Sequence, residues 1–330
     1  MAPPGSAEPA QPPIQWYPGH IAKAEQALTA SLDKVDLVLE VRDARIPQAT
    51  SHPRLGRWIR GKEHVLVLNR MDMVPPAARL AWDQWFRERQ LNPLWCEAKA
   101  GKGVKTLQKA AVGAGAALNA RRVARGMRPR PVRALVLGFP NVGKSALINR
   151  LVGQRVVESA RRPGVTRSLR WVRLGQELDL LDAPGVLPPQ LEDQRAALLL
   201  AICDDIGQAA YDPELVGLAF LRLLMELQSQ PGSGSLPGML ERRYRLPEAS
   251  LTPIDPHQID PSHVSTWLAA AASQHTNGDS PRMAMKILDD FRRSLLGPVA
   301  LEFPPAPSSD QTRSTLIDTP RPSQPNGLLA

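Results

Sequence analysis

Cysteine pairs and long apolar runs are the features that this chain of 330 residues lacks. Its two cysteines, Cys96 and Cys203, do not have the spacing of metal ligands, which argues against disulfides and a zinc site and suits a reducing cytosol. No stretch approaches the roughly 18 apolar residues of a membrane-spanning helix, and the proline-rich residues 1–13 lack the apolar block of a signal peptide. We therefore expect a soluble, unexported, cytoplasmic protein without a membrane partner.

Basic residues outnumber acidic ones, 41 against 32, which gives a formal net charge of +9. This excess favours a polyanionic partner, and RNA is preferred over a membrane because no amphipathic basic helix is obvious. The length allows one large core and a smaller one, so two domains are expected.

Strand-like and helix-like segments alternate over the first 190 residues or so. The expected strands are 35–41, 65–69, 93–96, 132–138, 171–174 and 178–181, with helices such as 76–90 and 104–118 between most of them. This alternation predicts an α/β fold with a doubly wound sheet, in which ligands bind at the carboxyl ends of the strands.

Helix-type apolar spacing replaces this pattern from about residue 190, and no internal repeat is evident. The end of the chain is rich in Pro, Ser and Thr. The predicted division is a disordered N-terminus over 1–13, an α/β domain over 14–192, an all-helical domain over 193–300 and a disordered tail over 301–330.

A glycine-rich loop of the form G-x-x-x-x-G-K-S, Gly138 to Ser145, follows the apolar strand 132–137. Its glycines let successive backbone N–H groups and the next helix N-terminus face phosphate oxygens, and Lys144 is expected to bridge the β and γ phosphates. The expected phosphate-loop residues are Asn141, Val142, Gly143, Lys144, Ser145 and Ala146.

Mg²⁺ needs a near-octahedral oxygen shell beside these phosphates. Ser145 is expected to supply a hydroxyl, as is Thr166 in the nucleoside-triphosphate state, while Asp182 at the end of strand 178–181 reaches the ion through water. In Asp182-Ala183-Pro184-Gly185, the backbone N–H of Gly185 is expected to meet the γ phosphate.

Asn69-Arg70-Met71-Asp72, after the apolar strand 65–68, resembles the N-K-x-D element that reads guanine. Asp72 can accept hydrogen bonds from both N1–H and the 2-amino group of guanine, and such sites reject a mismatched base by roughly 10⁴ or more. Glu97, Ala98 and Lys99 resemble the S-A-K loop that supports the guanine oxygen. Arg70 stands for the usual Lys and Glu97 for the usual Ser; a flat guanidinium can still cover the base, so we expect the choice of base to persist.

The joint occurrence of these elements argues against a coincidence of glycine turns and surface acids. Their order is unusual, because the base-reading element comes before the phosphate loop here and normally comes after it in GTPases. The segments W-Y-P-G-H-I-A-K-A (16–24) and E-V-R-D-A-R-I-P (40–47) are similar to the opening motifs of the circularly permuted GTPases of the ribosome biogenesis GTPase A (YlqF-type) family. The resemblance is specific over about 14–190 and weaker to about 297.

This resemblance implies a circularly permuted Ras-like P-loop GTPase with a C-terminal helical RNA- or ribosome-binding domain. It further implies a cytoplasmic factor for late assembly of the large (50S) ribosomal subunit, which binds rRNA and ribosomal proteins, uses GTP, GDP and Mg²⁺, and leaves when GTP is hydrolysed. We expect the protein to be a monomer, although the resemblance does not imply it. Because of the permutation, residues 187–189 lead from the γ-phosphate-sensing segment into the helical domain, either as a lever or as an ordinary linker.

Val186 follows Gly185 where many GTPases have a water-orienting glutamine, so hydrolysis needs another group beside Lys144, Thr166 and Gly185. Asn141 stands where potassium-activated GTPases hold K⁺ with an asparagine; the alternative is a loop-stabilising hydrogen bond. His20 is the candidate to meet the attacking water, as the resemblance suggests; the alternative is a loop histidine bound to backbone or RNA.

Arginines are dense between the two permuted halves, at Arg121, Arg122, Arg125, Arg128 and Arg130. Such a run is either a solvated face or an RNA contact, and arginine's ability to bond phosphates and stack on bases favours RNA. Asp43 and Arg45 fit a cap with an exposed charge or an rRNA contact equally well.

Two other functions stay open: a nucleotide-gated RNA-binding module with little turnover, and a metabolic P-loop kinase. Asp72 and the Asp182–Gly185 element argue against the kinase, because phosphoryl transfer to a metabolite does not require guanine reading. Multiple-turnover GTP hydrolysis with and without large ribosomal subunits separates the other two.

Asp72→Asn is predicted to weaken GTP binding and to strengthen xanthosine triphosphate binding, because the amide supplies a donor where the carboxylate accepted one. Titration of each nucleotide into the variant checks this. An unchanged GTP affinity would contradict the assignment of the base-reading loop.

Overall fold

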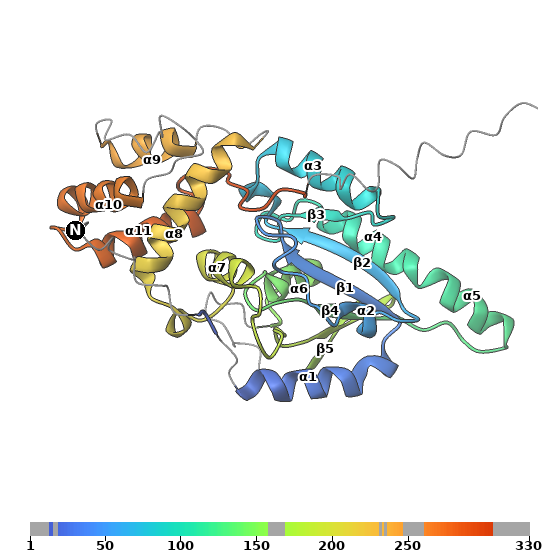
Figure 1. Cartoon of the computed structure of the whole chain (residues 1–330). Coiled ribbons are helices and arrows are strands. Elements are labelled where there is room, and N and C mark those ends of the chain that lie inside the picture. The colour runs from blue at the N-terminus through green and yellow to red at the C-terminus, as the bar shows by residue number, and fades with distance from the viewer. Residues whose placement is uncertain are drawn as a thin grey trace, which may run out of the picture.

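The fold is a three-layer α/β/α sandwich joined to a group of helices (Figure 1). The computed structural model describes residues 13–15, 19–157, 169–230, 233, 236–246 and 261–305. Within these ranges one six-stranded sheet has the order β3-β2-β1-β4-β6-β5, parallel except for β5 against β6. The strands are β1 Leu37–Asp43, β2 Glu63–Asn69, β3 Leu94–Cys96, β4 Val132–Leu137, β5 Arg170–Leu174 and β6 Leu178–Asp182.

Helices cover both faces of the sheet, which is why the central strand β1 is buried along its whole length. One face packs under α4 (Val104–Ala114) and α6 (Lys144–Val152), and the other under α1 (Gly19–Ser31), α2 (Leu55–Trp58) and α3 (Pro76–Arg87). The short 3-10 helices η1 Leu32–Lys34 and η2 Met71–Met73 follow α1 and β2. The doubly wound sheet predicted from the alternating pattern is thereby confirmed.

The helix expected over 104–118 is instead two helices, α4 and α5 (Ala116–Ala124), with a break at Gly115. α5 projects from the sandwich at one side (Figure 1). None of its residues is buried, because it extends beyond the sheet edge.

Three of the helices after residue 192 begin at well-defined caps. Asp193, Asp212 and Asp279 each accept hydrogen bonds from backbone N–H groups in the first helical turn. The elements are α7 Gln194–Cys203, η3 Gln208–Ala210, α8 Pro213–Glu226, η4 Leu227–Ser229, α9 Leu236–Tyr244, α10 Pro261–His275 and α11 Ser280–Arg292. Among the described helices, none combines the length and apolar character required to cross a bilayer.

The chain returns to the α/β domain after α11 through residues 299–303, here named the C-terminal strap. The Val299 N–H donates to the Met73 carbonyl at 2.9 Å, and the Leu301 N–H donates to the Arg45 carbonyl at 3.0 Å. The expected start of a disordered tail at residue 301 is therefore wrong, because Leu301 is buried in the core and Phe303 packs against it. Residues 306–330, like 1–12, lie outside the described ranges.

Glu302 in the strap predicts a pH dependence of folding stability. Its carboxylate accepts the Gln48 and Ala49 N–H groups at 2.7 and 3.0 Å, yet burial raises the pKa of Glu302 to about 7. The folded protein thus holds this proton at pH values where the unfolded chain has lost it. The resulting stability is complete below the ordinary glutamate pKa and is lost as pH rises through 7.

Glu302→Gln should remove this dependence, so its melting temperature should change less than that of the wild type between about pH 5 and 7.5. Thermal unfolding followed by circular dichroism across this range is the measurement, with Glu63→Gln at an exposed position as the control. Parallel curves for wild type and Glu302→Gln would refute it.

Candidate nucleotide site

The glycine-rich loop joins β4 to α6 at the carboxyl edge of the sheet, as the sequence predicts. Gly143 has φ +98°, and a Cβ there would lie 2.2 Å from Asn69 Nδ2, so this position accepts only glycine without displacement. The Lys144 ammonium is buried and donates to the carbonyls of Gly138 and Phe139 at 3.1 and 2.8 Å. Burial lowers the pKa of Lys144 to about 8, against the opposing effect of Asp182 and Asp205.

Asp182 ends β6 next to this loop and fits a magnesium shell. It is buried, its Oδ1 has no hydrogen-bond partner in the described part of the chain, and burial raises its pKa to about 6 against the effect of Lys144. Ser145 lies in the first turn of α6. A carboxylate oxygen without a partner and a hydroxyl are oxygen donors of the kind Mg²⁺ prefers, so Ser145 and Asp182 would hold the ion, which neutralises phosphate charge.

Gly185 lies against the phosphate loop: a Cβ on it would be 2.5 Å from the Pro140 nitrogen. The next residue, Val186, donates its N–H to the Gly138 carbonyl at 3.3 Å. The segment after β6 therefore packs directly against the phosphate loop. Thr166 and the His20 side chain lie outside the described part of the structure. The His20 backbone is in the first turn of α1.

Asn69 at the end of β2 joins three loops. Its Nδ2 donates to the Val142 carbonyl of the phosphate loop at 2.9 Å, and its Oδ1 accepts the Ala98 N–H at 3.1 Å. Asn69 is thus a buried brace between the phosphate loop and the 97–99 loop, whereas Asp72 is exposed on η2. The brace holds the base-reading and phosphate-binding parts in register.

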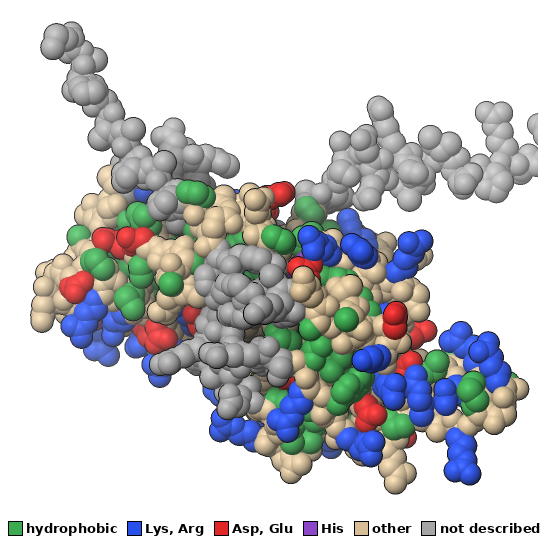
Figure 2. All heavy atoms as spheres, turned by 90° about the horizontal axis from the view of Figure 1, so that it is seen from below, with side chains coloured by type: hydrophobic (Ala, Val, Ile, Leu, Met, Phe, Trp, Pro, Cys, Tyr) green, Lys and Arg blue, Asp and Glu red, His purple; other side chains and the backbone are tan. Residues whose placement is uncertain are grey.

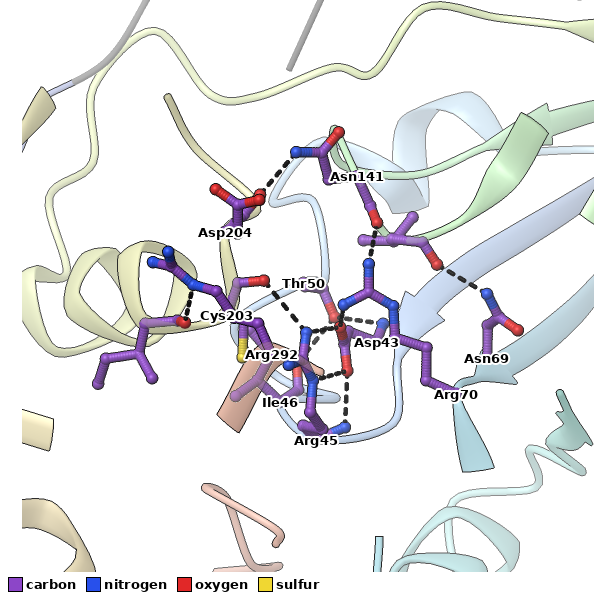
Figure 3. A network of polar contacts seen from close by, with 12 residues as sticks. Asp43, Arg45, Ile46, Thr50, Asn69, Arg70, Asn141, Cys203, Asp204 and Arg292 are labelled. Carbon is purple, nitrogen blue, oxygen red and sulfur yellow. Dashed lines mark hydrogen bonds and ion pairs between the residues drawn. The ribbon is translucent and has the colours of Figure 1, made fainter. Parts of the chain in front are cut away.

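Arg70 is used differently from the expectation that its guanidinium covers the base. Its backbone is left-handed (φ +64°), and the guanidinium donates to Asp43 Oδ2 at 3.0 Å and to the Asn141 carbonyl of the phosphate loop (Figure 3). It therefore fixes the phosphate loop to the end of β1.

Comparison with known proteins agrees with the nucleotide-binding geometry of this site. Residues 133–216 match the family model described as 50S ribosome-binding GTPase. "Ribosome biogenesis GTPase A" of Priestia megaterium is 36% identical over 71% of this chain and 79% of its own length, and that of Bacillus pumilus is 32% identical over 88% and 99%. The chain belongs to the ribosome biogenesis GTPase A family.

Two solved structures share the fold. The GDP-bound structure of YlqF gives a TM-score of 0.53 at 22% identity over 84% of this chain and 98% of that one. The GNP-bound YlqF of T. maritima gives 0.52 at 21% identity over 85% and 98%. The predicted P-loop GTPase fold with a helical C-terminal region is confirmed. As a member of the ribosome biogenesis GTPase A family, the protein binds guanine nucleotide and hydrolyses GTP.

Asp43 and Arg45 of this GTPase are fully buried, so both an exposed charge and an rRNA contact are wrong for them. Arg45 donates to both Asp43 oxygens, at 3.0 and 2.7 Å, and to the Cys203 carbonyl at 3.2 Å. Burial alone would raise the pKa of Asp43, but Arg45 and Arg70 hold it below its ordinary value. Asp205 beside them is also buried, and burial raises its pKa to about 8.

The C-terminal end of α7 collects donors from several parts of the chain. Besides Arg45, Asn141 Nδ2 donates to the Asp204 carbonyl at 2.7 Å, and Arg292 of α11 donates to the Ala201 and Ile202 carbonyls at 2.7 and 2.9 Å (Figure 3). The last carbonyls of a helix lack intrahelical partners and carry partial negative charge, so these donors fit the position. The hydrogen bond of Asn141 is the loop-stabilising alternative to potassium binding.

The basic segment divides in two. Arg121, Arg125 and Arg128 are exposed on and after α5 and Arg122 is half-buried; Lys and Arg side chains gather over this projecting end of the molecule (Figure 2). Arg130 differs, because its guanidinium forms a two-pronged ion pair with Asp36 at 2.7 and 2.8 Å. Arg130 therefore anchors the segment, and the other four remain available.

Asn69→Ala and Asn69→Asp test the brace. Each leaves a buried backbone group without its partner, which costs about 1–3 kcal/mol per group, so GDP affinity should fall by roughly 10-fold or more. Because Asn69 bridges the two loops and Asp72 is the residue expected to read the base, GDP and xanthosine diphosphate should lose affinity by the same factor, measured by calorimetric titration. A change in base preference, or no loss at all, would contradict this role.

Proposed function

We propose that this GTPase acts, as a monomer in the cytoplasm, in late assembly of the large (50S) ribosomal subunit. Its GTP-bound form holds the subunit through rRNA and ribosomal proteins, and hydrolysis promotes release. The observation that carries the proposal is the bond between the phosphate loop and the helical domain, from Asn141 to the Asp204 carbonyl.

Helix α7 connects the two domains at both of its ends. Its beginning follows Asp182–Gly185 after only a short segment, in which Leu187 and Leu191 are buried. Its end is held by the phosphate loop through Asn141. A change at the γ phosphate would thus act on the first turn of α7, while the phosphate loop restrains its last turn. This arrangement supports the interpretation of residues 187–189 as a lever.

The catalytic assignments rest on what Val186 cannot do. Val186 is buried against Leu181 and Ala183 in the apolar cluster that α1 covers, so it cannot orient water. We assign this task to His20, at the start of α1, and assign K⁺ binding to Asn141 in the GTP-bound state, with Lys144, Thr166 and Gly185 acting on the phosphates.

Two other readings predict different behaviour. A nucleotide-gated RNA-binding module would bind subunits without turning over GTP faster. A kinase is disfavoured because Asp72 and the Asp182–Gly185 element are features of guanine reading and γ-phosphate sensing, which phosphoryl transfer to a metabolite does not require.

The decisive measurement is subunit affinity with a GTP analogue and with GDP, together with hydrolysis with and without large subunits. We expect tighter binding in the GTP-analogue state and faster hydrolysis with subunits, since the site lacks a built-in water-orienting group. Arg292→Ala should reduce the ratio of the two affinities by about 5-fold or more while preserving nucleotide affinity, because it loosens the end of α7. Arg293→Ala is the control, since its side chain is exposed and pairs only with Asp289 in the described structure. Equal binding in both states with no stimulation would overturn the proposal.

The catalytic assignments have their own test. Exchange of K⁺ for Na⁺ at constant ionic strength should slow hydrolysis, and Asn141→Ala should abolish the difference. His20→Ala should keep nucleotide affinity and lose turnover, because it acts on water and not on bound phosphates. Equal rates in both salts would contradict the potassium assignment. Normal turnover by His20→Ala would contradict the histidine assignment.

A further inference from the structure

The edge strand β5 carries an exposed tryptophan that the nucleotide chemistry does not use. Trp171 is 42% exposed. It pairs with Leu181 of β6 and so lies on the sheet face that α1 and η1 cover only in part, the face that also bears Arg173. A large aromatic ring left in solvent on a folded domain is a feature to be explained.

Cations from three elements line the same hollow as this ring. The Arg133 guanidinium of β4 lies 5.8 Å from the centre of the Trp171 ring, Arg173 is largely exposed on β5, and Lys34 comes from η1. Together with Asp179 they line a shallow hollow of about 430 Å³. Asp179 contacts Arg173 at 3.4 Å, so three cations face one carboxylate.

The basic segment after α5 is anchored next to this hollow, because its Arg130 and the backbone N–H of Arg133 both bond to the Asp36 carboxylate. The ion pair between Arg130 and Asp36 anchors that segment. Asp36 follows Lys34 by two positions in the sequence, and Arg130 precedes Arg133 by three. Arg121, Arg125 and Arg128 on and after α5 are exposed as well, and Lys and Arg side chains gather over this projecting end of the molecule (Figure 2).

We propose that Trp171, with Lys34, Arg133 and Arg173, is a stacking site for an unpaired base of RNA. The proposal rests on the ribosomal function above and names the RNA feature recognised: a single-stranded nucleotide whose base lies on the indole while its phosphates meet the cations. The chemistry favours RNA over protein, because a protein interface needs an apolar centre and this hollow offers one ring among charges.

The test measures binding of a fluorescent, unstructured RNA oligonucleotide to the full chain over a series of salt concentrations. Trp171→Ala should weaken binding by about 5- to 150-fold, the range for one lost base–aromatic stack, without changing the slope of log affinity against log salt. Trp171→Phe should keep most of the affinity, because phenylalanine retains a ring face. Arg133→Ala and Arg173→Ala should each reduce the slope by roughly 0.7 for a single strand.

Leu80→Ala, at an exposed apolar position on α3, should bind as the wild type does, and every variant should keep its GTP affinity. A duplex of the same sequence should bind more weakly than the single strand, because its bases are already stacked. The proposal fails if Trp171→Ala binds RNA like Leu80→Ala, if the duplex binds equally well, or if Trp171→Ala loses subunits but not RNA, which would assign the surface to a protein. Failure of the ribosomal function would instead appear in the wild type, as subunits that neither bind by nucleotide state nor stimulate hydrolysis.

Discussion

The buried carboxylate of Asp43 is the constraint on which the nucleotide site depends. A charge this far from water must be paired, and removing one partner of such a group is strongly destabilising. Its two partners also bind different parts of the fold: Arg70 donates a hydrogen bond to the phosphate loop, and Arg45 donates one to the end of α7. One anion therefore fixes the relative positions of the base-reading loop, the phosphate loop and the helical domain.

The permuted chain order makes this fixation necessary. The base-reading loop and the phosphate loop belong to separate halves joined through α5 and the basic segment, so no short connection holds them together. Asn69 and Arg70 instead join the two loops by hydrogen bonds between residues more than seventy positions apart in the sequence. The C-terminal strap adds a third restraint, because Val299 binds the carbonyl of Met73 beside Asp72.

Sequence alone predicted the strands and the loops that follow them, because the phosphate loop and the base reader each depend on a local chemistry that few residue types satisfy. It did not predict that Asp43 and Arg45 are buried, nor what Arg70 contacts. Arg45 meets a carbonyl 158 positions away, and no local periodicity records such a partner. The strap was assigned in part to a tail for the same reason: Leu301 is buried by elements far away in the chain. The one available signal was the charge pattern Asp43-Ala44-Arg45 directly after an apolar strand, where an ion pair could have been inferred.

The same reasoning limits what the net charge of +9 means. Several arginines that contribute to it are committed inside the fold: Arg45 and Arg70 to Asp43, Arg130 to Asp36, and Arg292 to the carbonyls of α7. These side chains stabilise the structure and release no counterions when a polyanion binds. Attraction to RNA must come from exposed side chains, and those on and after α5 and beside β5 are the ones that the proposed RNA site would use. A protein whose overall charge suggests diffuse binding therefore has the means to bind at one place, in a fixed orientation relative to its nucleotide site.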